Sequence, residues 1–336
     1  DEQKALSLYD KTTSPFIIPI KAGWQRQKHE LTKTRRKRGM VVYRTPCGKS
    51  MLHIGEVAEY LQSTRSDLTI ELFSFSFAVD EGAVFSYDAS RVVLDDLSGG
   101  MERRPITVFN DVDDDPAPQF EYKVHRYPFN STVEITDEDY CSGCDCQDNC
   151  ADSTKCACQQ LTFFESKKKT TGYSGKNLPS HVNSGVYECN SNCSCRRDRE
   201  RCFNRVAQND IIVPLQVFKT GNSGWGVRTL SDVPSGTFVS CLHGPVITNE
   251  MATDQEGYGE YFAELDFCSM CELGKHFKRE NSTETFLLDV KTAGNIARLY
   301  NHSCEPNLYC QHIFVNTHDA RLPWVAFFAK RTIKAG

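Results

Sequence analysis

The sequence has no apolar run long enough to cross a membrane. Its longest runs, such as WVAFFA at 324–329, are about a third of the ~20 residues that a membrane-spanning helix needs. The first ten residues, DEQKALSLYD, also lack the apolar stretch of a secretory signal. These two absences argue against a membrane protein and against a secreted one, so we expect the chain to act inside a cell.

The composition describes a soluble globular protein with one unusual feature. Its 336 residues suffice for two or three domains, and 39% apolar and 25% charged residues are ordinary values. The 16 cysteines are the exception. Because thiols stay reduced inside cells, dense cysteine there indicates metal binding rather than disulfides.

Most of the cysteines lie in one block between 141 and 202. Three C-x-C pairs occur in it, and a single intervening residue makes it hard to wrap both thiolates around one tetrahedral zinc ion. Such a pair more naturally spans two neighbouring metals. Three tetrahedral zinc ions need about twelve sulfur contacts, which nine cysteines provide if three of them bridge two metals each. The candidate ligands are Cys144, Cys146, Cys150, Cys156, Cys158, Cys189, Cys193, Cys195 and Cys202.

This spacing predicts a structural three-zinc cluster. Three dications and nine thiolates leave a formal charge of about −3, which the adjacent RRDRER at 196–201 is expected to compensate in part. A set of buried free thiols does not explain the spacing, and an iron–sulfur cluster is a weaker alternative. The other cysteines, such as Cys141 and Cys241, are expected to be small buried residues or inert thiols.

The net charge of −5 hides two local runs of opposite sign. Between Lys21 and Arg38 there are eight Lys or Arg and one acid; such a run is usually a solvated loop, but it can contact phosphates or acidic partners. The stretch NDVDDDPAP at 110–118 combines acid with proline. It is predicted to be a linker or an exposed loop.

The pattern of apolar residues predicts a mostly β protein of the α+β class. Residues 40–77 predict a small α/β module, with a strand, a turn at TPCGK, a helix through Ile54–Leu61 and then an aromatic strand. From Ile211 onward, short β-rich segments alternate with turn signals, and one short helical stretch is predicted over 292–299.

Two stretches after the cysteine block carry the chemistry, GNSGWGVRTL at 221–230 and GNIARLYNHSCEPN at 294–307. Alone, the first could be a β-turn and the second a polar loop. Together they resemble the two S-adenosylmethionine-binding motifs of SET domains, and the block before them resembles the pre-SET region of SET-domain histone lysine methyltransferases. The resemblance implies the three-zinc, nine-cysteine cluster and a β-rich SET domain with a knot-like crossing of the chain.

The residue types in the first motif suit a bound cofactor. Gly224 and Gly226 let the backbone approach a ligand closely, and Trp225 offers a face to a cationic sulfonium or to adenine. Methyl transfer from a sulfonium is an in-line displacement by a neutral amine, and neutral lysine at pH 7 costs about 4.6 kcal/mol. A dry aromatic channel and the nearby positive sulfur both favour the neutral amine.

The resemblance assigns further residues to the cofactor and the channel. Arg298, Asn301 and His302 are expected to help hold the cofactor; Asn301 can donate to and accept from an adenine edge, and His302 is expected to contribute its backbone, although taken singly it would more often be structural. Tyr261 in GEYFAELD aligns with a tyrosine beside the methyl-transfer channel and is the candidate catalytic residue within this sequence, with a core aromatic as the alternative. Phe286 is a candidate second wall of the cofactor or channel region.

In the family the chain continues beyond the equivalent of KRTIKAG into a strand with the main catalytic tyrosine and then into a three-cysteine tail. The resemblance implies that Cys304 joins those three cysteines on a fourth zinc ion. A fragment that ends at Gly336 is therefore expected to be inactive or nearly so.

The N-terminal part resembles a methyl-CpG-binding domain through GWQRQ at 23–27, the basic run, YRTPCGK at 43–49 and YLQSTRSDLTIELFSFSF at 60–77. Arg26 matches one of the two arginines that such domains place on guanine, a contact worth ~1–3 kcal/mol, but Leu52 stands at the second position. We therefore expect phosphate-driven, weakly selective DNA contact at most, or a role in protein contacts. The candidate DNA-binding residues are Arg26, Arg35, Arg36, Lys37 and Arg38.

This order of domains is similar to the SETDB class of enzymes, which methylate lysine nine of histone H3. It implies an S-adenosylmethionine-dependent lysine methyltransferase in nuclear chromatin, with the histone H3 tail and chromatin repressor proteins as partners. The alternative is a chromatin-binding scaffold that keeps the SET fold and binds DNA or partners without catalysis. The predicted organisation is a tail (1–15), a methyl-CpG-binding-like domain (16–80), a connecting region (81–138), a pre-SET region (139–206) and an incomplete SET domain (207–336).

Overall fold

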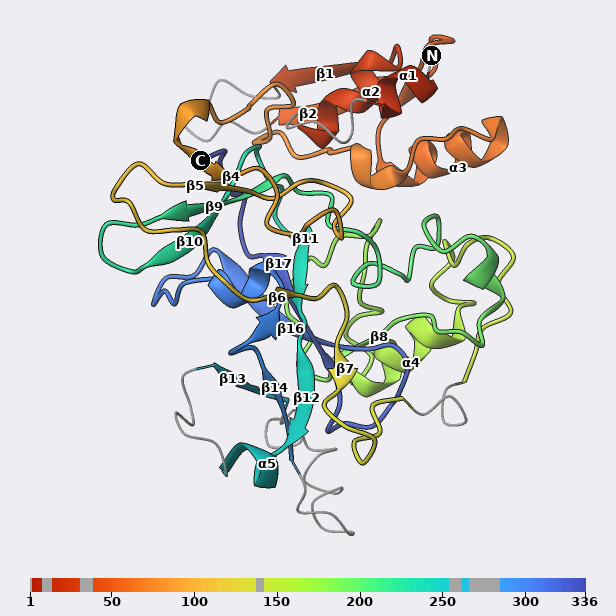
Figure 1. Cartoon of the computed structure of the whole chain (residues 1–336). Coiled ribbons are helices and arrows are strands. Elements are labelled where there is room, and N and C mark those ends of the chain that lie inside the picture. Colours follow the sequence, from red (N-terminus) through yellow and green to blue (C-terminus); the bar gives the residue numbers. More distant parts are fainter. Residues whose placement is uncertain (1, 8–13, 31–38, 137–141, 254–260, 266–284) are drawn as a thin grey trace.

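The computed structural model describes residues 2–7, 14–30, 39–136, 142–253, 261–265 and 285–336. Figure 1 shows a small N-terminal module lying across one end of a larger body of short strands, with the cysteine block beside that body. The described residues are mostly β with few helices, as predicted. None of these helices combines the length and the apolar character needed to cross a bilayer.

The N-terminal module is a three-stranded antiparallel sheet, in the order β1-β2-β3, with a helix, α3. The predicted helix is confirmed: the ring of His53 accepts from the amide of Glu56 at its start, and Arg65 ends it in the left-handed region at φ 53°. Trp24 packs edge-on against Phe73 in the core, with ring centroids 4.8 Å apart. The elements are α1 (Glu2–Leu6), η1 (Pro15–Ile17), α2 (Ile18–Lys21), β1 (Gln25–Glu30), β2 (Gly39–Arg44), β3 (Ser50–Met51), α3 (Ile54–Thr64) and η2 (Ile70–Leu72).

The aromatic strand predicted at the end of this module is wrong. The chain turns through the 3-10 helix η2 and then runs extended through 73–76, with no strand partner among the described residues. Side chains replace a strand partner: the hydroxyl of Tyr43 accepts from the amide of Ser74 at 3.1 Å, and Arg26 donates to the carbonyls of Ser74 and Ser76. In this module the alternating aromatic residues therefore belong to an extended segment that side-chain hydrogen bonds hold in place, and not to a strand.

Residues 81–138, predicted as a connecting region, contribute strands to the C-terminal body. One sheet has the order β10-β9-β5-β4, in which β5 pairs in parallel with β9. In the same segment β6 pairs in parallel with β15, and β7 with β12. These elements are η3 (Ala89–Arg91), β4 (Val92–Leu94), β5 (Thr107–Phe109), β6 (Glu121–Tyr122) and β7 (Tyr127–Pro128).

The β-rich segments predicted after Ile211 are confirmed as β9, β11, β14 and β17. The helical stretch predicted over 292–299 is a single 3-10 turn, η6. Two further sheets have the orders β11-β17-β16-β8 and β13-β14-β12-β7. The remaining elements are α4 (Ala157–Glu165), β8 (Val186–Tyr187), η4 (Ser194–Arg197), β9 (Leu215–Lys219), β10 (Trp225–Thr229), β11 (Phe238–Leu242), β12 (Pro245–Thr248), α5 (Asn249–Thr253), β13 (Phe262–Glu264), β14 (Phe286–Asp289), β15 (Ala293–Gly294), η6 (Ile296–Leu299), β16 (Leu308–Phe314) and β17 (Trp324–Ala329).

Candidate functional site

The structure gathers all nine predicted metal ligands into one cluster. Eight of them are buried and Cys146 is half-buried. Their sulfur atoms form four overlapping groups of four, each with all sulfurs within 4.8 Å of one another. Cys144 and Cys189 each belong to three of these groups. Sharing of this kind is what a multi-metal cluster with bridging thiolates requires.

The distances between sulfurs test which chemistry the cluster suits. The Sγ atoms of Cys144, Cys150 and Cys189 form a triangle with sides of 3.7 Å. Zn–S bonds of ~2.3 Å in a tetrahedron place two sulfurs about 3.8 Å apart, whereas a disulfide holds them at ~2.05 Å. The cysteines of this cluster are free thiols. Their spacing therefore fits tetrahedral metal coordination.

The backbone around the cluster is shaped to bring its two halves together. A Cβ on Gly143 would lie 2.2 Å from the carbonyl oxygen of Asn192, so only glycine permits this approach. Cys150 has φ 60°, a left-handed conformation that residues other than glycine rarely adopt. The amide of Asn190 donates to the sulfur of Cys193 at 3.2 Å. Such donors stabilise the thiolate form that binds metal.

A buried arginine supplies positive charge at the cluster, and sequence reasoning missed it. Arg205 is 1% exposed, and its guanidinium donates to the carbonyl of Asn190 at 2.5 Å, while its Nε has no partner in the described structure. Burial lowers the pKa of Arg205, but the hydrogen bond and charge of Cys195, with the charges of Cys202 and Cys189, raise it overall. Arg196 and Arg197, from the run predicted to compensate the cluster, are exposed.

The two predicted cofactor motifs meet in space. The hairpin of β9 and β10 turns at Gly224, which has φ 64°, and its carbonyl accepts from the amide of Thr220 at 2.8 Å. The side-chain amide of Asn301 donates to the carbonyl of Trp225 at 3.2 Å. A Cβ on Gly226 would lie 3.0 Å from the Asn301 nitrogen. Gly226 is therefore the residue that allows the second motif to close on the first.

Trp225 already has a cation on its ring. The ammonium of Lys219 lies 5.2 Å from the centre of the Trp225 ring, within the range of a cation–π contact. Lys219 also pairs with Asp115 and, at 3.3 Å, with Asp113. The acidic stretch predicted as a linker or exposed loop thus closes on the hairpin. The ring of Trp225 thus contacts a lysine, and its predicted contact with the sulfonium or adenine stays a prediction.

Arg298 lies beside the predicted catalytic tyrosine. Its guanidinium is 4.4 Å from the ring centre of Phe120 and 5.2 Å from that of Tyr261, and it donates to the carbonyls of Val290 at 2.7 Å and Lys291 at 3.0 Å. Burial lowers the pKa of Arg298. Tyr261 is 43% exposed, so the structure places it at the surface and not in the core. Arg298 therefore fixes the backbone near Tyr261.

The other predicted site residues divide between core and surface. Phe286 is 6% exposed and packs in an apolar cluster, with the guanidinium of Arg321 5.3 Å from its ring centre. Phe286 therefore lies in the core, and its assignment as a wall of the cofactor or channel region stays a prediction. His302 and Cys304 are exposed neighbours, with Nε2 and Sγ 3.8 Å apart.

A cavity of about 320 Å³ lies where the two motifs meet. Gly226 and Asn301 line it together with Phe218, Arg228 and Tyr300. The Tyr300 hydroxyl is within 2.8 Å of the Ser240 hydroxyl, and burial raises the pKa of this tyrosine, which stays neutral. The cavity is the candidate cofactor cleft on geometric grounds, and Arg228 and Tyr300 are members that sequence reasoning missed.

The structure corrects the predicted DNA contact of Arg26. Its side chain is fully buried, and it donates to the carboxylate of Glu81 and the carbonyl of Ser76 at 2.7 Å and to the carbonyl of Ser74 at 3.0 Å. A guanidinium used in this way is not presented to a base edge. The other candidates, Arg35, Arg36, Lys37 and Arg38, lie outside the described residues.

Comparison with known proteins gives the class. Family models match in three places, Methyl-CpG binding domain at 11–82, Pre-SET motif at 98–205 and SET domain at 224–336. Among solved structures, KRYPTONITE in complex with mCHH DNA, an H3(1-15) peptide and SAH is 31% identical with a TM-score of 0.60, over 74% of this chain and 47% of that one. The Neurospora SET domain protein DIM-5, a histone lysine methyltransferase, is 27% identical with a TM-score of 0.57, over 69% and 92%. The fold and the two motifs thus define a SET-domain protein with a pre-SET cysteine cluster.

Among curated relatives, the histone-lysine N-methyltransferases met-2 of Caenorhabditis elegans and eggless of Drosophila melanogaster are 32% and 33% identical over 96% of this chain. Human SETDB2, also a histone-lysine N-methyltransferase, is 37% identical over 74% of this chain and 35% of its own length. The chain spans about a third of the length of met-2 and eggless. It belongs to the SETDB, eggless and met-2 family of histone-lysine methyltransferases, with the MBD, pre-SET and SET domains in that order.

Proposed function

We propose that this chain is the catalytic part of an S-adenosylmethionine-dependent lysine methyltransferase that acts on lysine nine of histone H3 in nuclear chromatin. The observation that carries the proposal is the hydrogen bond from Asn301 to Trp225, which joins the two motifs beside the 320 Å³ cavity. The relatives named as histone-lysine methyltransferases, and an H3 peptide and SAH in the KRYPTONITE complex, support it.

In this proposal the cofactor supplies a methyl group on a cationic sulfur, and the residues of the chain position it. Gly226 and Asn301 hold the cofactor against the hairpin, and the exposed Tyr261 orients the incoming amine. Arg298 keeps the backbone beside Tyr261 in place through Val290 and Lys291. Alignment of the amine with the methyl group supplies much of the acceleration, because in-line displacement depends on orientation.

The cysteine cluster is proposed to hold three zinc ions, in a structural role. All nine cysteines lie in the overlapping groups of four. With three of them bridging, they would supply sulfur to every coordination position of three tetrahedral ions and would leave no open site for a substrate. The buried Arg205 offsets part of the negative charge of the thiolates. Cys304, exposed beside His302, is the candidate ligand of a fourth zinc ion.

The alternative function is a chromatin scaffold that binds DNA or partners without catalysis. The cavity beside Gly226 favours the enzyme, because a scaffold needs no cofactor cleft. The test is transfer of a radiolabelled methyl group to an H3 peptide by the full-length protein, compared with the same peptide carrying alanine at lysine nine. We expect transfer to the first peptide only, and at least a tenfold lower rate with Tyr261→Phe at unchanged cofactor affinity. Absence of transfer together with no cofactor binding by calorimetry would establish the scaffold.

A further inference from the structure

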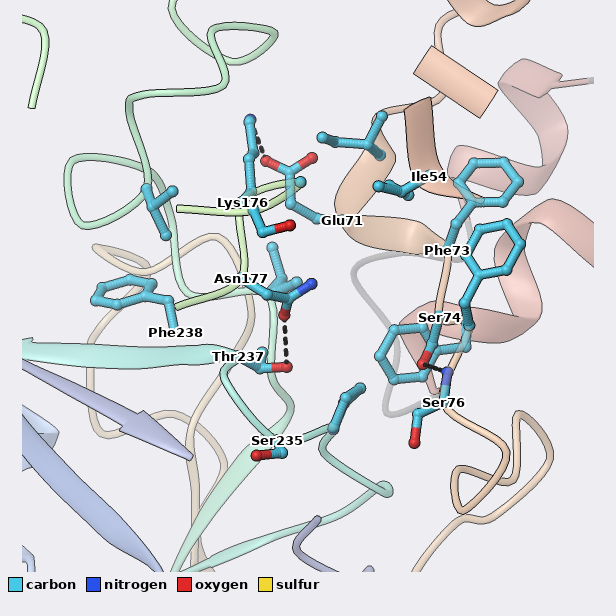
Figure 2. A pocket seen from close by; sticks show the side chains of 18 of the residues that line it. Ile54, Glu71, Phe73, Ser74, Ser76, Lys176, Asn177, Ser235, Thr237 and Phe238 are labelled. Atoms are coloured by element: carbon cyan, nitrogen blue, oxygen red, sulfur yellow. Dashed lines mark hydrogen bonds and ion pairs between the residues drawn. The ribbon is translucent and has the colours of Figure 1, made fainter. Parts of the chain in front are cut away.

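The loop at 174–177 of the pre-SET region contacts the N-terminal module through a buried lysine. The side chain of Lys176 is 2% exposed, and its ammonium contacts the carboxylate of Glu71 in the module and the carbonyl of Glu200 beside the cysteine cluster. Figure 2 shows the lysine reaching across to Glu71 at one end of a cleft. Lysine is almost never fully buried unless it is paired. The burial of this ion pair therefore indicates a specific, packed interface between the loop and the N-terminal module.

The backbone of the loop is shaped for this contact. Lys176 has φ 63°, in the left-handed region that a lysine rarely adopts. Ser174 and Asn177 close the loop with two main-chain hydrogen bonds, of 2.8 and 3.1 Å. A Cβ on the neighbouring Gly175 would lie 2.6 Å from Ile54 of α3, so the loop and the helix are in direct contact. The strained conformation persists because its surroundings hold it.

Residues next to the candidate ligand Cys202 also contact the module. The guanidinium of Arg201 donates to the carbonyl of Ser66 at 2.8 Å. Phe203, the residue after the candidate ligand Cys202, packs against the apolar core of the module together with Ile212. One residue of the pre-SET region and one of the SET domain therefore pack against the core of the module.

A second attachment lies at the other end of the module. Asp232 accepts from the amide of Asp80 at 3.1 Å and pairs with Lys334 at 2.6 Å, and Lys334 also donates to the carbonyl of Ala78 at 2.7 Å. Arg26 organises this same segment through its bonds to the carbonyls of Ser74 and Ser76. Arg26, which matches a base-reading arginine in the sequence, therefore holds the segment at 74–80 that contacts the SET domain.

Between the two attachments the packing is open. A cleft of about 550 Å³ separates Phe73–Ser76 of the module from Ser235–Phe238 of the SET domain, and Figure 2 shows these two groups on opposite sides of it. The attachments at Lys176 and Asp232 therefore lie on the two sides of this cleft. Removal of one of them is expected to loosen the module.

We propose that the methyl-CpG-binding-like module is a docked structural partner of the pre-SET region, held in one orientation by the Lys176–Glu71 pair. It is not a DNA reader on a free tether. The proposal does not depend on methyl transfer, and its test needs no cofactor. Two domains joined by a linker would move independently, whereas the segment that follows the module pairs with the sheets of the body through β4, β5, β6 and β7.

The test is amide hydrogen exchange of the full-length protein, wild type against Lys176→Met. Exchange is expected to rise at least tenfold in α3 and at 199–203, on the two sides of the contact, with β16 and β17 unchanged. Lys169→Met, which alters an exposed lysine near the same loop, is expected to match the wild type. Unchanged exchange at α3 in Lys176→Met would overturn the proposal, and so would an equal rise throughout the protein.

Two further variants cover the case in which Lys176→Met does not fold. Glu71→Gln combined with Lys176→Met removes both charges, so no unpaired carboxylate is left buried. Its exchange at α3 is expected to lie between that of the wild type and that of Lys176→Met. If Lys176→Met cannot be purified, the double variant is compared with the wild type alone, and a small rise at α3 is expected. Arg201→Met removes the bond to Ser66 alone and is expected to raise exchange at 65–68. Unchanged exchange at α3 in the double variant, together with unchanged exchange at 65–68 in Arg201→Met, would show that these contacts do not hold the module.

Discussion

The side-chain amide of Asn301 donates to the main-chain carbonyl of Trp225 across 3.2 Å, joining residues 76 positions apart in the chain. The bond uses a backbone acceptor, so it needs the strand at Trp225 to lie close. Gly226 is the residue that makes this approach possible, because any Cβ there would contact the Asn301 nitrogen.

Gly226→Ala is expected to weaken S-adenosylmethionine binding. The added methyl group would lie 3.0 Å from the Asn301 nitrogen and 3.1 Å from Thr220 Cγ2, which displaces Asn301 by a few tenths of an ångström. Loss of a hydrogen bond costs about 1–2 kcal/mol, or roughly five- to thirtyfold in affinity. Titration calorimetry measures it. Gly221→Ala is the matched control, since nothing lies within 4 Å of a Cβ there; equal affinity of the two variants would contradict the assignment of the cleft.

Cys189→Ser is expected to lower the zinc content and the melting temperature. Cys189 belongs to three of the four sulfur groups, so its loss removes a shared ligand, and structural zinc contributes folding free energy directly. Elemental analysis is expected to give three zinc ions for the wild type from this cluster and fewer for the variant. Cys310→Ser, at an exposed thiol in β16, is expected to keep the wild-type content. Iron in place of zinc would support the rival cluster.

Arg26→Met is expected to destabilise the protein. The change leaves the carbonyls of Ser74 and Ser76 and the carboxylate of Glu81 without their donor. Unsatisfied buried groups of this kind cost about 2–4 kcal/mol in total. Urea unfolding measures the change. Lys28→Met, at an exposed residue of the same strand, is the control, and a stability for Arg26→Met equal to that of Lys28→Met would contradict the structural role.

Stability is expected to fall in acid through His243. Burial, with the charges of His125 and Arg126, lowers the pKa of His243 from 6.5 to about 3. The unfolded chain therefore takes up the proton first as the pH falls. The stabilisation from His243 is complete above pH ~6.5 and is lost progressively as the pH falls below it. The loss reaches about 3 kcal/mol at pH 4.

The measurement compares the free energy of unfolding at pH 7 and pH 4 for the wild type and His243→Phe. Phenylalanine keeps an aromatic ring against Trp324, which lies 5.6 Å from His243 between ring centroids, but does not titrate. A smaller loss of stability in acid is expected for this variant than for the wild type. His29→Asn, at an exposed histidine of β1, is expected to behave as the wild type does; a wild-type acid loss in His243→Phe would refute the prediction.

Features set by residue type and spacing were predictable from the sequence. The single-residue gaps in C-x-C predicted a shared cluster because two adjacent thiolates cannot easily reach one metal, and the structure gathers the nine cysteines that this reasoning selected. The helix of the N-terminal module followed from its apolar spacing.

Features that depend on which distant part of the chain lies beside a side chain in the fold were not predictable. Arg26 matches a base-reading arginine in type and position, but its partners are carbonyls of a segment about 50 residues away. Lys219 and the acidic stretch at 110–118 have ordinary polar patterns, and only the folded sheet brings them together over Trp225. A phenylalanine such as Phe286 suits the wall of a ligand site and a core position equally well, so the sequence alone did not decide between these two roles.

The parallel pairing of β5 with β9 has a consequence for the order of folding. It joins residues 107–109 to 216–218, so the sheet that carries the Trp225 hairpin closes a loop of more than a hundred residues. The cysteine block lies inside that loop, and its collapse around metal shortens the distance that the two strands must search, since closure entropy grows with the length of free chain. Assembly of the hairpin sheet is therefore expected to follow metal uptake, so that a chain made without zinc would stall with its two halves apart.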